Sequence, residues 1–101
     1  MELRECPDAV HLHVTGPVRL GETATLQELC INALERGQDV VVDLSTAEHL
    51  HAAALQILRA LEIRLTAVGR SFAVAAPSSK AATAIDLGGL GRWLSQVKEQ
   101  Q

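Results

Sequence analysis

The sequence has few aromatic residues, and this shortage excludes one class of function. Phe and Trp together make up 2% of the 101 residues, and Tyr is absent. Proteins that bind single-stranded nucleic acid stack the bases on exposed aromatic rings. A chain with so few rings is poorly suited to that function. Its core is therefore expected to be aliphatic and rich in alanine.

The sequence also lacks a basic block and a long apolar run. Its nine Lys and Arg residues are scattered and its net charge is −3, so it has no electrostatic footprint for nucleic acid or anionic lipid. The apolar runs are far shorter than the roughly 20 residues of a membrane span. Charged residues among the first eight argue against a signal peptide. We therefore expect a cytoplasmic protein without direct membrane insertion.

Cysteine is scarce as well. Cys6 and Cys30 lack the spacing of a metal or redox motif, so we expect two reduced thiols. Hydrophobic residues make up 48% of the chain, which is enough to fill one core. Because the chain begins at Met1 and is short, residues 1–101 are expected to form one small domain.

The pattern predicts an α/β fold with the order β-β-α-β-α-β-α-α. Strands are expected at residues 2–6, 10–15, 39–44 and 71–75, and helices at 25–36, 52–68, 80–87 and 92–98. The unbroken run Val40–Val42 is typical of a parallel strand that is buried on both faces. Residues 45–49 are expected to be a polar linker. Thr25–Glu28 fits a capping box, and a serine is expected to cap the 80–87 helix.

The expected 52–68 helix has two apolar faces of unequal size. Placing its residues at 100° steps gives a buried face, which consists of Ala54, Leu55, Leu58, Leu61, Leu65 and Val68. The opposite face holds Gln56, Ala60, Ile63 and Ala67. Ile63 is therefore an apolar residue that should face water, with Arg59, Glu62 and Arg64 as a charged rim. Plain surface and a flat docking face for a partner both fit this pattern.

The four histidines form two H-x-H pairs, His11/His13 and His49/His51, which invite a zinc interpretation. His11 and His13 lie early in the expected 10–15 strand, whereas His49 and His51 lie beyond the C-terminal end of the 39–44 strand. If these strands are parallel neighbours, the two pairs lie at opposite ends of the sheet. We therefore expect surface histidines, which would matter as partner contacts or pH-sensitive groups, and no metal site. Asp43 is expected to accept N–H bonds from a loop.

No arrangement typical of an enzyme is present. The chain has no Ser/His/Asp or Cys/His constellation and no Gly-rich phosphate loop. Glu48 and His49 are sequence neighbours, so on an extended segment their side chains would point apart. We expect no catalytic residue, no cofactor and no enzymatic activity.

Taken together, these elements and residues resemble the STAS family, which includes anti-sigma factor antagonists and the cytoplasmic tails of sulfate transporters. The resemblance covers nearly the whole chain. It is carried by Val40–Ser45, by Leu50, Leu55 and Leu58, and by Gly69, Pro77-Ser78 and the closing Gly89–Leu94. It implies a small mixed sheet with helices packed mainly on one face.

The resemblance also locates a regulatory position. Switching antagonists carry Asp-Ser-Ser-Gly or Asp-Thr-Ser-Gly where this helix begins, and a GHKL-type kinase phosphorylates the first hydroxyl residue. In this chain the stretch is His51-Ala52-Ala53-Ala54, with Ala52 at the acceptor position. Alanine has no oxygen to accept phosphate. The nearest hydroxyls, on Ser45 and Thr46, lie seven and six residues earlier, and neither they nor the His51 nitrogen is the favoured acceptor.

The resemblance therefore implies a non-catalytic adaptor that takes part in signalling and regulation of transcription by binding another protein. Its partner would be an anti-sigma factor or a GHKL-type serine kinase. An ABC ATPase of a phospholipid transport complex is the alternative partner, and a small-ligand or nucleotide sensor is a further one. A homodimer is left open. The expected contact residues are Glu48, His49, His51, Ala52, Ala53, Arg59, Ala60 and Ile63.

Overall fold

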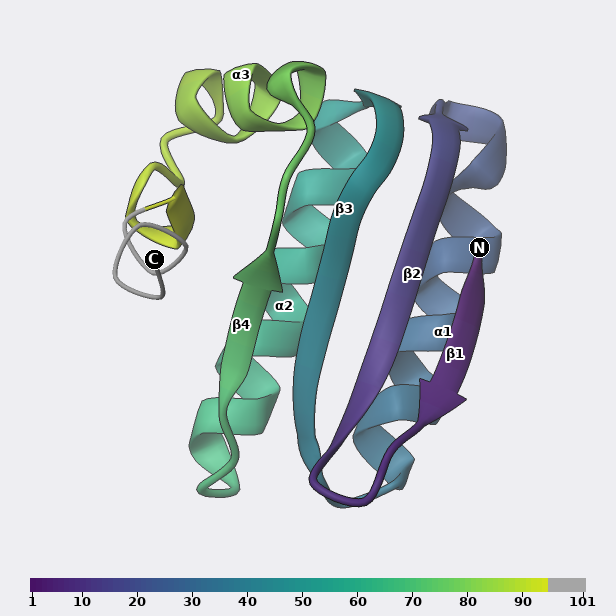
Figure 1. The fold of residues 1–101 in the computed structure, drawn as a ribbon, viewed down its shortest axis with the longest axis vertical. Coiled ribbons are helices and arrows are strands. Elements are labelled where there is room, and N and C mark those ends of the chain that lie inside the picture. The colour runs from purple at the N-terminus through teal and green to yellow at the C-terminus, as the bar shows by residue number, and fades with distance from the viewer. Residues whose placement is uncertain (95–101) are drawn as a thin grey trace.

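The computed structural model describes residues 1–94 and confirms the expected order of elements (Figure 1). The strands are β1 (Glu2–Glu5), β2 (Ala9–Val18), β3 (Asp39–Leu50) and β4 (Phe72–Ala75). The helices are the short 3-10 helix η1 (Leu20–Glu22), α1 (Thr23–Glu35), α2 (Ala52–Ala67) and α3 (Ser79–Leu87). Residues 92–94 begin a further helical turn, and the rest of the helix expected at 92–98 lies outside the described residues.

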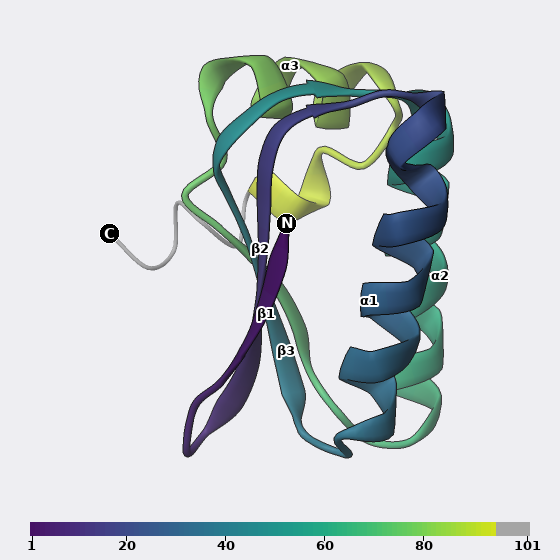
Figure 2. The same cartoon turned by 90° about the vertical axis from the view of Figure 1, so that its right-hand side faces the viewer.

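The four strands form one mixed sheet in the order β1-β2-β3-β4. β1 is antiparallel to β2, whereas β2, β3 and β4 are parallel. α1 and α2 lie on one face of this sheet, and α3 lies across the end where β2 and β3 finish (Figure 2). The other face of the sheet carries no helix among residues 1–94.

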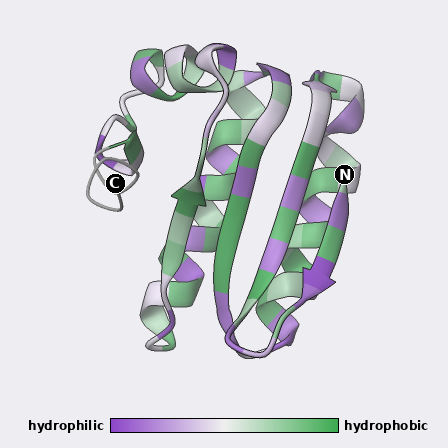
Figure 3. Ribbon diagram, in the orientation of Figure 1, coloured by the Kyte–Doolittle hydropathy of each residue, from purple (hydrophilic) through white to green (hydrophobic). Residues whose placement is uncertain are grey.

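The core lies between the sheet and the helices α1 and α2. Hydrophobic and hydrophilic residues alternate along β2 (Figure 3), because only one of its faces is covered. Burial alternates along the first half of β3 as well, with Val40 and Val42 buried and Val41 only half-buried. The expectation that this strand is buried on both faces is therefore wrong. Within the described chain, no helix is both long and apolar enough to cross a membrane.

β3 is longer than the sequence indicated, because residues 45–49 continue the strand rather than form a linker. They pair with the end of β2, which passes through Gly16-Pro17 to Val18. The register shifts twice along this pair, and each shift places one extra residue in β3. The buried residues Leu44, Ala47 and Leu50 are consequently three apart. Spacing of three hides the two-residue period by which a strand is recognised.

The helix ends also differ in part from expectation. α1 begins at Thr23, so Thr25 lies inside the helix and does not open a capping box. Instead, Glu22 Oε1 accepts a hydrogen bond from the backbone N–H of Arg19 at 3.0 Å. Val68, which was placed on the buried face of α2, is 66% exposed because the helix ends at Ala67. The expected serine cap of α3 is confirmed, since Ser78 Oγ accepts from Ala81 N at 3.1 Å.

Candidate functional site: the β3–α2 junction

The junction between β3 and α2 is fixed by His51. This residue has extended backbone angles and is the N-cap of α2, and its Nδ1 accepts a hydrogen bond from the Ala53 N–H at 3.0 Å. Its own N–H donates to the Val18 carbonyl at 2.9 Å, which ties the start of α2 to the end of β2. An acceptor on the N-cap side chain satisfies one of the free N–H groups of the first turn. His51 thus has a structural role, because it caps α2 and ties it to β2.

The first turn of α2 presents methyl groups in place of hydroxyls. Ala52 is exposed, Ala53 is half-buried and Ala54 is buried. Ser45 and Thr46 are also exposed, but they lie in the paired part of β3, where Thr46 is the register partner of Thr15. The surface at the start of α2 is consequently apolar and without charge of its own.

α3 forms the second wall of a hollow beside this junction. The hollow has a volume of about 660 Å³ and is lined by Glu48, His49, Leu50, Ala52 and Leu55, and on the other side by Lys80, Thr83, Ala84, Leu87 and Gly88. Ser78 holds the two walls together, because its Oγ donates to the Ala47 carbonyl at 2.6 Å and its N–H donates to the Leu44 carbonyl at 3.0 Å. Three of the predicted contact residues, Glu48, His49 and Ala52, are brought together here. The contribution of α3 was not foreseen.

The other predicted contact residues lie on different sides of α2. Ala53 and Ala60 line a second groove of about 630 Å³ between α1 and α2, together with Ile31, Ile57 and Leu61. Ile63 is 52% exposed, as expected for a residue that faces water. It lines neither hollow. The predicted contact residues are therefore divided among separate surfaces: one cluster in the hollow beside α3, one pair in the groove between α1 and α2, and Ile63 outside both.

Glu62 is buried, although it was expected in the exposed rim beside Ile63. It is 8% exposed and receives three hydrogen bonds, two from Arg92 at 2.6 Å each and one from Arg59 at 2.7 Å. The bonds from Arg92 are the main influence on the pKa of Glu62; they and the bond from Arg59 lower it, and burial opposes them. Next to Arg92, the ring of Trp93 is fully buried with its centroid 5.2 Å from that of Phe72. The i,i+3 spacing of Arg59 and Glu62 was a visible signal, but nothing in the sequence links Glu62 to Arg92.

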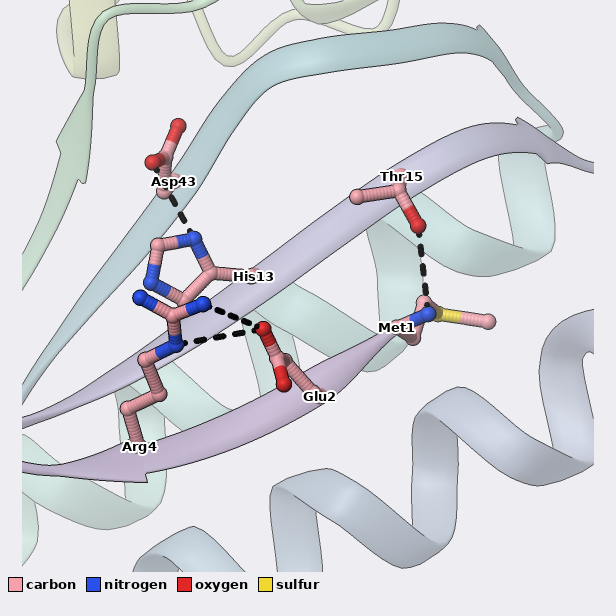
Figure 4. A network of polar contacts seen from close by, with 6 residues as sticks. All are labelled: Met1, Glu2, Arg4, His13, Thr15 and Asp43. Carbon is pink, nitrogen blue, oxygen red and sulfur yellow. Dashed lines mark hydrogen bonds and ion pairs between the residues drawn. The ribbon is translucent and has the colours of Figure 1, made fainter.

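The two histidine pairs lie far apart along the sheet. His11 and His13 are on its open face, where His13 Nδ1 lies 3.2 Å from Asp43 Oδ2 (Figure 4). His49 and His51 lie at the other end, where β3 passes into α2. In residues 1–94 no group of three or more His, Cys, Asp or Glu side chains is placed to hold a metal ion.

Asp43 stabilises the first irregularity of β3. Its Oδ1 accepts a hydrogen bond from the Ser45 N–H at 2.9 Å, beside the first register shift. Desolvation acts to raise the pKa of Asp43, but the hydrogen bonds from Ser45 and the nearby imidazoles of His13 and His11 outweigh it and lower the pKa. The expected N–H bond is present, within the strand rather than in a loop. The contact with His13 was not predicted.

The structure is thus a small mixed α/β domain, and the hollow at its β3–α2 junction is bounded on one side by α3. The chain belongs to the STAS family, because the family model described as "Mlab, STAS domain" matches residues 1–97. No curated protein matches the chain in sequence.

Two solved structures share the fold at low sequence identity. One is the anti-sigma factor antagonist SpoIIAA in its unphosphorylated form, with a TM-score of 0.79 and 14% identity, over 91% of this chain and 83% of that chain. The other is the NMR structure of the protein TM1081, with a TM-score of 0.76 and 19% identity, over 95% of this chain and 76% of that chain. Both likenesses establish the fold.

Proposed function

We propose that this STAS domain is a non-catalytic, cytoplasmic adaptor that binds another protein through the β3–α2 junction and needs no phosphorylation to do so. The observation that carries the proposal is the methyl-only first turn of α2, where Ala52 is exposed and lines a hollow. A phosphate at this point would add roughly −1.5 to −2 charges. Ala52 has no oxygen to accept a phosphate and adds no charge to the junction, so the surface stays in one binding state.

The geometry of the junction supports a standing docking surface. His51 caps α2 and Ser78 joins α3 to β3, so both walls of the hollow are fixed by hydrogen bonds. A surface that is ordered before binding loses little conformational entropy when a partner docks. The proposed contacts are Glu48, His49 and Ala52 in the hollow, with His51 as the residue that holds them in place. Arg59 and Ile63 extend the surface along α2.

The family supports two candidate partners. An anti-sigma factor or a GHKL-type kinase is the first candidate, since the fold is that of an anti-sigma factor antagonist. The ATPase of an ABC transport complex is the second. Both would contact the same junction, so the identity of the bound protein distinguishes them.

Site-specific photocrosslinking in the native cell tests the proposal. A benzophenone amino acid at position 52 should capture one protein, which mass spectrometry then identifies as a sigma regulator or an ATPase. The same group at Thr15, an exposed position outside the junction, is the control. Equal crosslinking from both positions, or none from position 52, would refute the junction as the docking surface.

A further inference from the structure

One stripe of α2 faces α3 and the chain that follows it. Ala52, Leu55, Arg59 and Glu62 are spaced at i, i+3, i+7 and i+10, which places them on one side of the helix. Ala52 and Leu55 line the hollow. Leu55 also lies so close to the end of α3 that a Cβ on Gly88 would come within 2.9 Å of its Cδ1. Glu62 binds Arg92, four residues beyond Gly88. The hollow and the arginines therefore adjoin each other along the helix.

The far end of this stripe is cationic. One buried carboxylate, that of Glu62, binds two guanidinium groups, so the cluster carries a surplus of one positive charge. The side chains of Arg59 and Arg92 are 46% and 48% exposed. An arginine has more N–H donors than these contacts use, because Glu62 accepts one bond from Arg59 and two from Arg92. Among residues 1–94 no other side chain accepts from the remaining donors, and these are the donors that an anion of a partner would use.

The two guanidinium groups are also held in place. Glu62 is fixed on α2, and Arg92 is anchored by its neighbour Trp93, whose side chain is fully buried. Arg92 further lies over the Trp93 ring, with its Cζ 5.9 Å from the ring centroid. Arginines that are ordered before binding lose little entropy on contact and recognise carboxylates with a defined geometry.

We propose that the hollow and the arginine pair form one groove for an α-helix of the partner protein. This helix would place apolar side chains against Ala52, Leu55 and Leu87, and a Glu or Asp against Arg59 and Arg92. Ala52 and Arg59 are seven residues apart on α2, which is about 10 Å at about 1.5 Å per residue, or two helical turns. On the partner helix, the carboxylate would therefore follow the apolar side chain that contacts Ala52 by the same distance. The rim of the hollow carries one charge of each sign, Glu48 and Lys80, so the arginine pair sets the charge preference.

This inference rests on the proposed function and names the chemistry of the partner segment. The test titrates the full, ¹⁵N-labelled chain with a short, capped helical peptide that carries two leucines and, two turns later, two glutamates. A second peptide has glutamine in place of glutamate. We expect the glutamate peptide to shift the amide signals of Ala52, Leu55 and Thr83 and the Nε–H signal of Arg59. Its affinity should exceed that of the glutamine peptide about tenfold, or about 1.4 kcal/mol.

Two variants make the test specific. Arg59→Gln removes one of the two guanidinium groups and should reduce the preference for glutamate. It should not unfold the chain, because it leaves the contact between Glu62 and Arg92 in place. Arg64→Gln, at an exposed position that lines the groove on the other side of α2, is the matched control and should bind like the original chain. Equal affinity for both peptides, shifts confined to other faces, or no shift at millimolar peptide would overturn the groove. If position 52 crosslinks a partner and Arg59→Gln leaves the binding of that partner unchanged, the groove proposal is refuted. The proposed adaptor function would then still stand.

Discussion

Glu62 offers the sharpest test of how the C-terminal part of the described chain is attached. Glu62→Gln keeps the size of the side chain and removes its charge. Hydrogen bonds to charged groups contribute about 1.5–3 kcal/mol each, and exposed partners reduce that value. Because both arginines are about half exposed, we expect an overall loss of about 1–3 kcal/mol in the free energy of unfolding. Urea denaturation at pH 7 measures it.

The same variant makes a prediction about pH. The pKa of Glu62 is lower in the folded chain than its usual value, so its stabilising effect is complete above the pKa of an unfolded Glu, about 4.3. That effect is lost as the pH falls through the lower, folded pKa, because the unfolded chain takes up the proton first. The difference between the original chain and Glu62→Gln should therefore be largest at neutral pH and shrink in acid. The contribution of Asp43 is present in both chains and cancels.

Trp93 gives the local signal for this experiment, since it is the only tryptophan and is buried beside the cluster. Its fluorescence should report the release of Arg92 in Glu62→Gln. Arg59→Gln is the matched control and should cost less, because it removes one of the three hydrogen bonds and leaves Arg92 bound. A stability difference that stays constant from pH 3 to pH 7 would show that the ionisation of Glu62 is not its source. A Glu62→Gln chain as stable as the original would show that the charged contacts contribute nothing.

Four further predictions concern the core, the cap and the docking surface. Leu58→Ala should cost about 2–5 kcal/mol in urea denaturation, because Leu58 is fully buried between α2 and the sheet; a near-neutral result would contradict its place in the core. His51→Ala should lose about 0.5–2 kcal/mol through the missing cap, and His51→Asp, which restores an acceptor, should recover it. Ile63→Glu should change stability by less than about 0.5 kcal/mol and weaken capture of the partner; a large drop in melting temperature would show a core role instead. Incubation with a GHKL-type serine kinase and labelled ATP should leave the chain unlabelled. Stoichiometric label on Ser45 or Thr46 would refute the proposal that the adaptor needs no phosphorylation.

The sequence predicted well wherever a single period governs an element. The leucines of α2 recur at helical spacing, so their buried face and the outward position of Ile63 could both be derived. It failed where a second segment decides the outcome. The two register shifts of β3 exist only in relation to β2. They replace strand alternation with spacings of three, from Leu44 to Ala47 and from Ala47 to Leu50. Likewise, the burial of Glu62 depends on Arg92, thirty residues later in the chain.

The junction illustrates why the candidate site could be located from sequence and yet not be understood from it. The resemblance stated from the sequence implies that a switch would lie at position 52, where this chain has alanine. The structure shows that the neighbouring position has a structural role, because the imidazole of His51 accepts the Ala53 N–H and caps α2. A helix that starts with a cap and methyl groups needs no phosphate to complete its first turn. Replacing Ala52 with Ser would therefore supply an acceptor to a kinase while leaving the cap intact. Capping of α2 and phosphorylation can for that reason be tested separately. Substitution at position 51 changes the cap, and substitution at position 52 changes the acceptor.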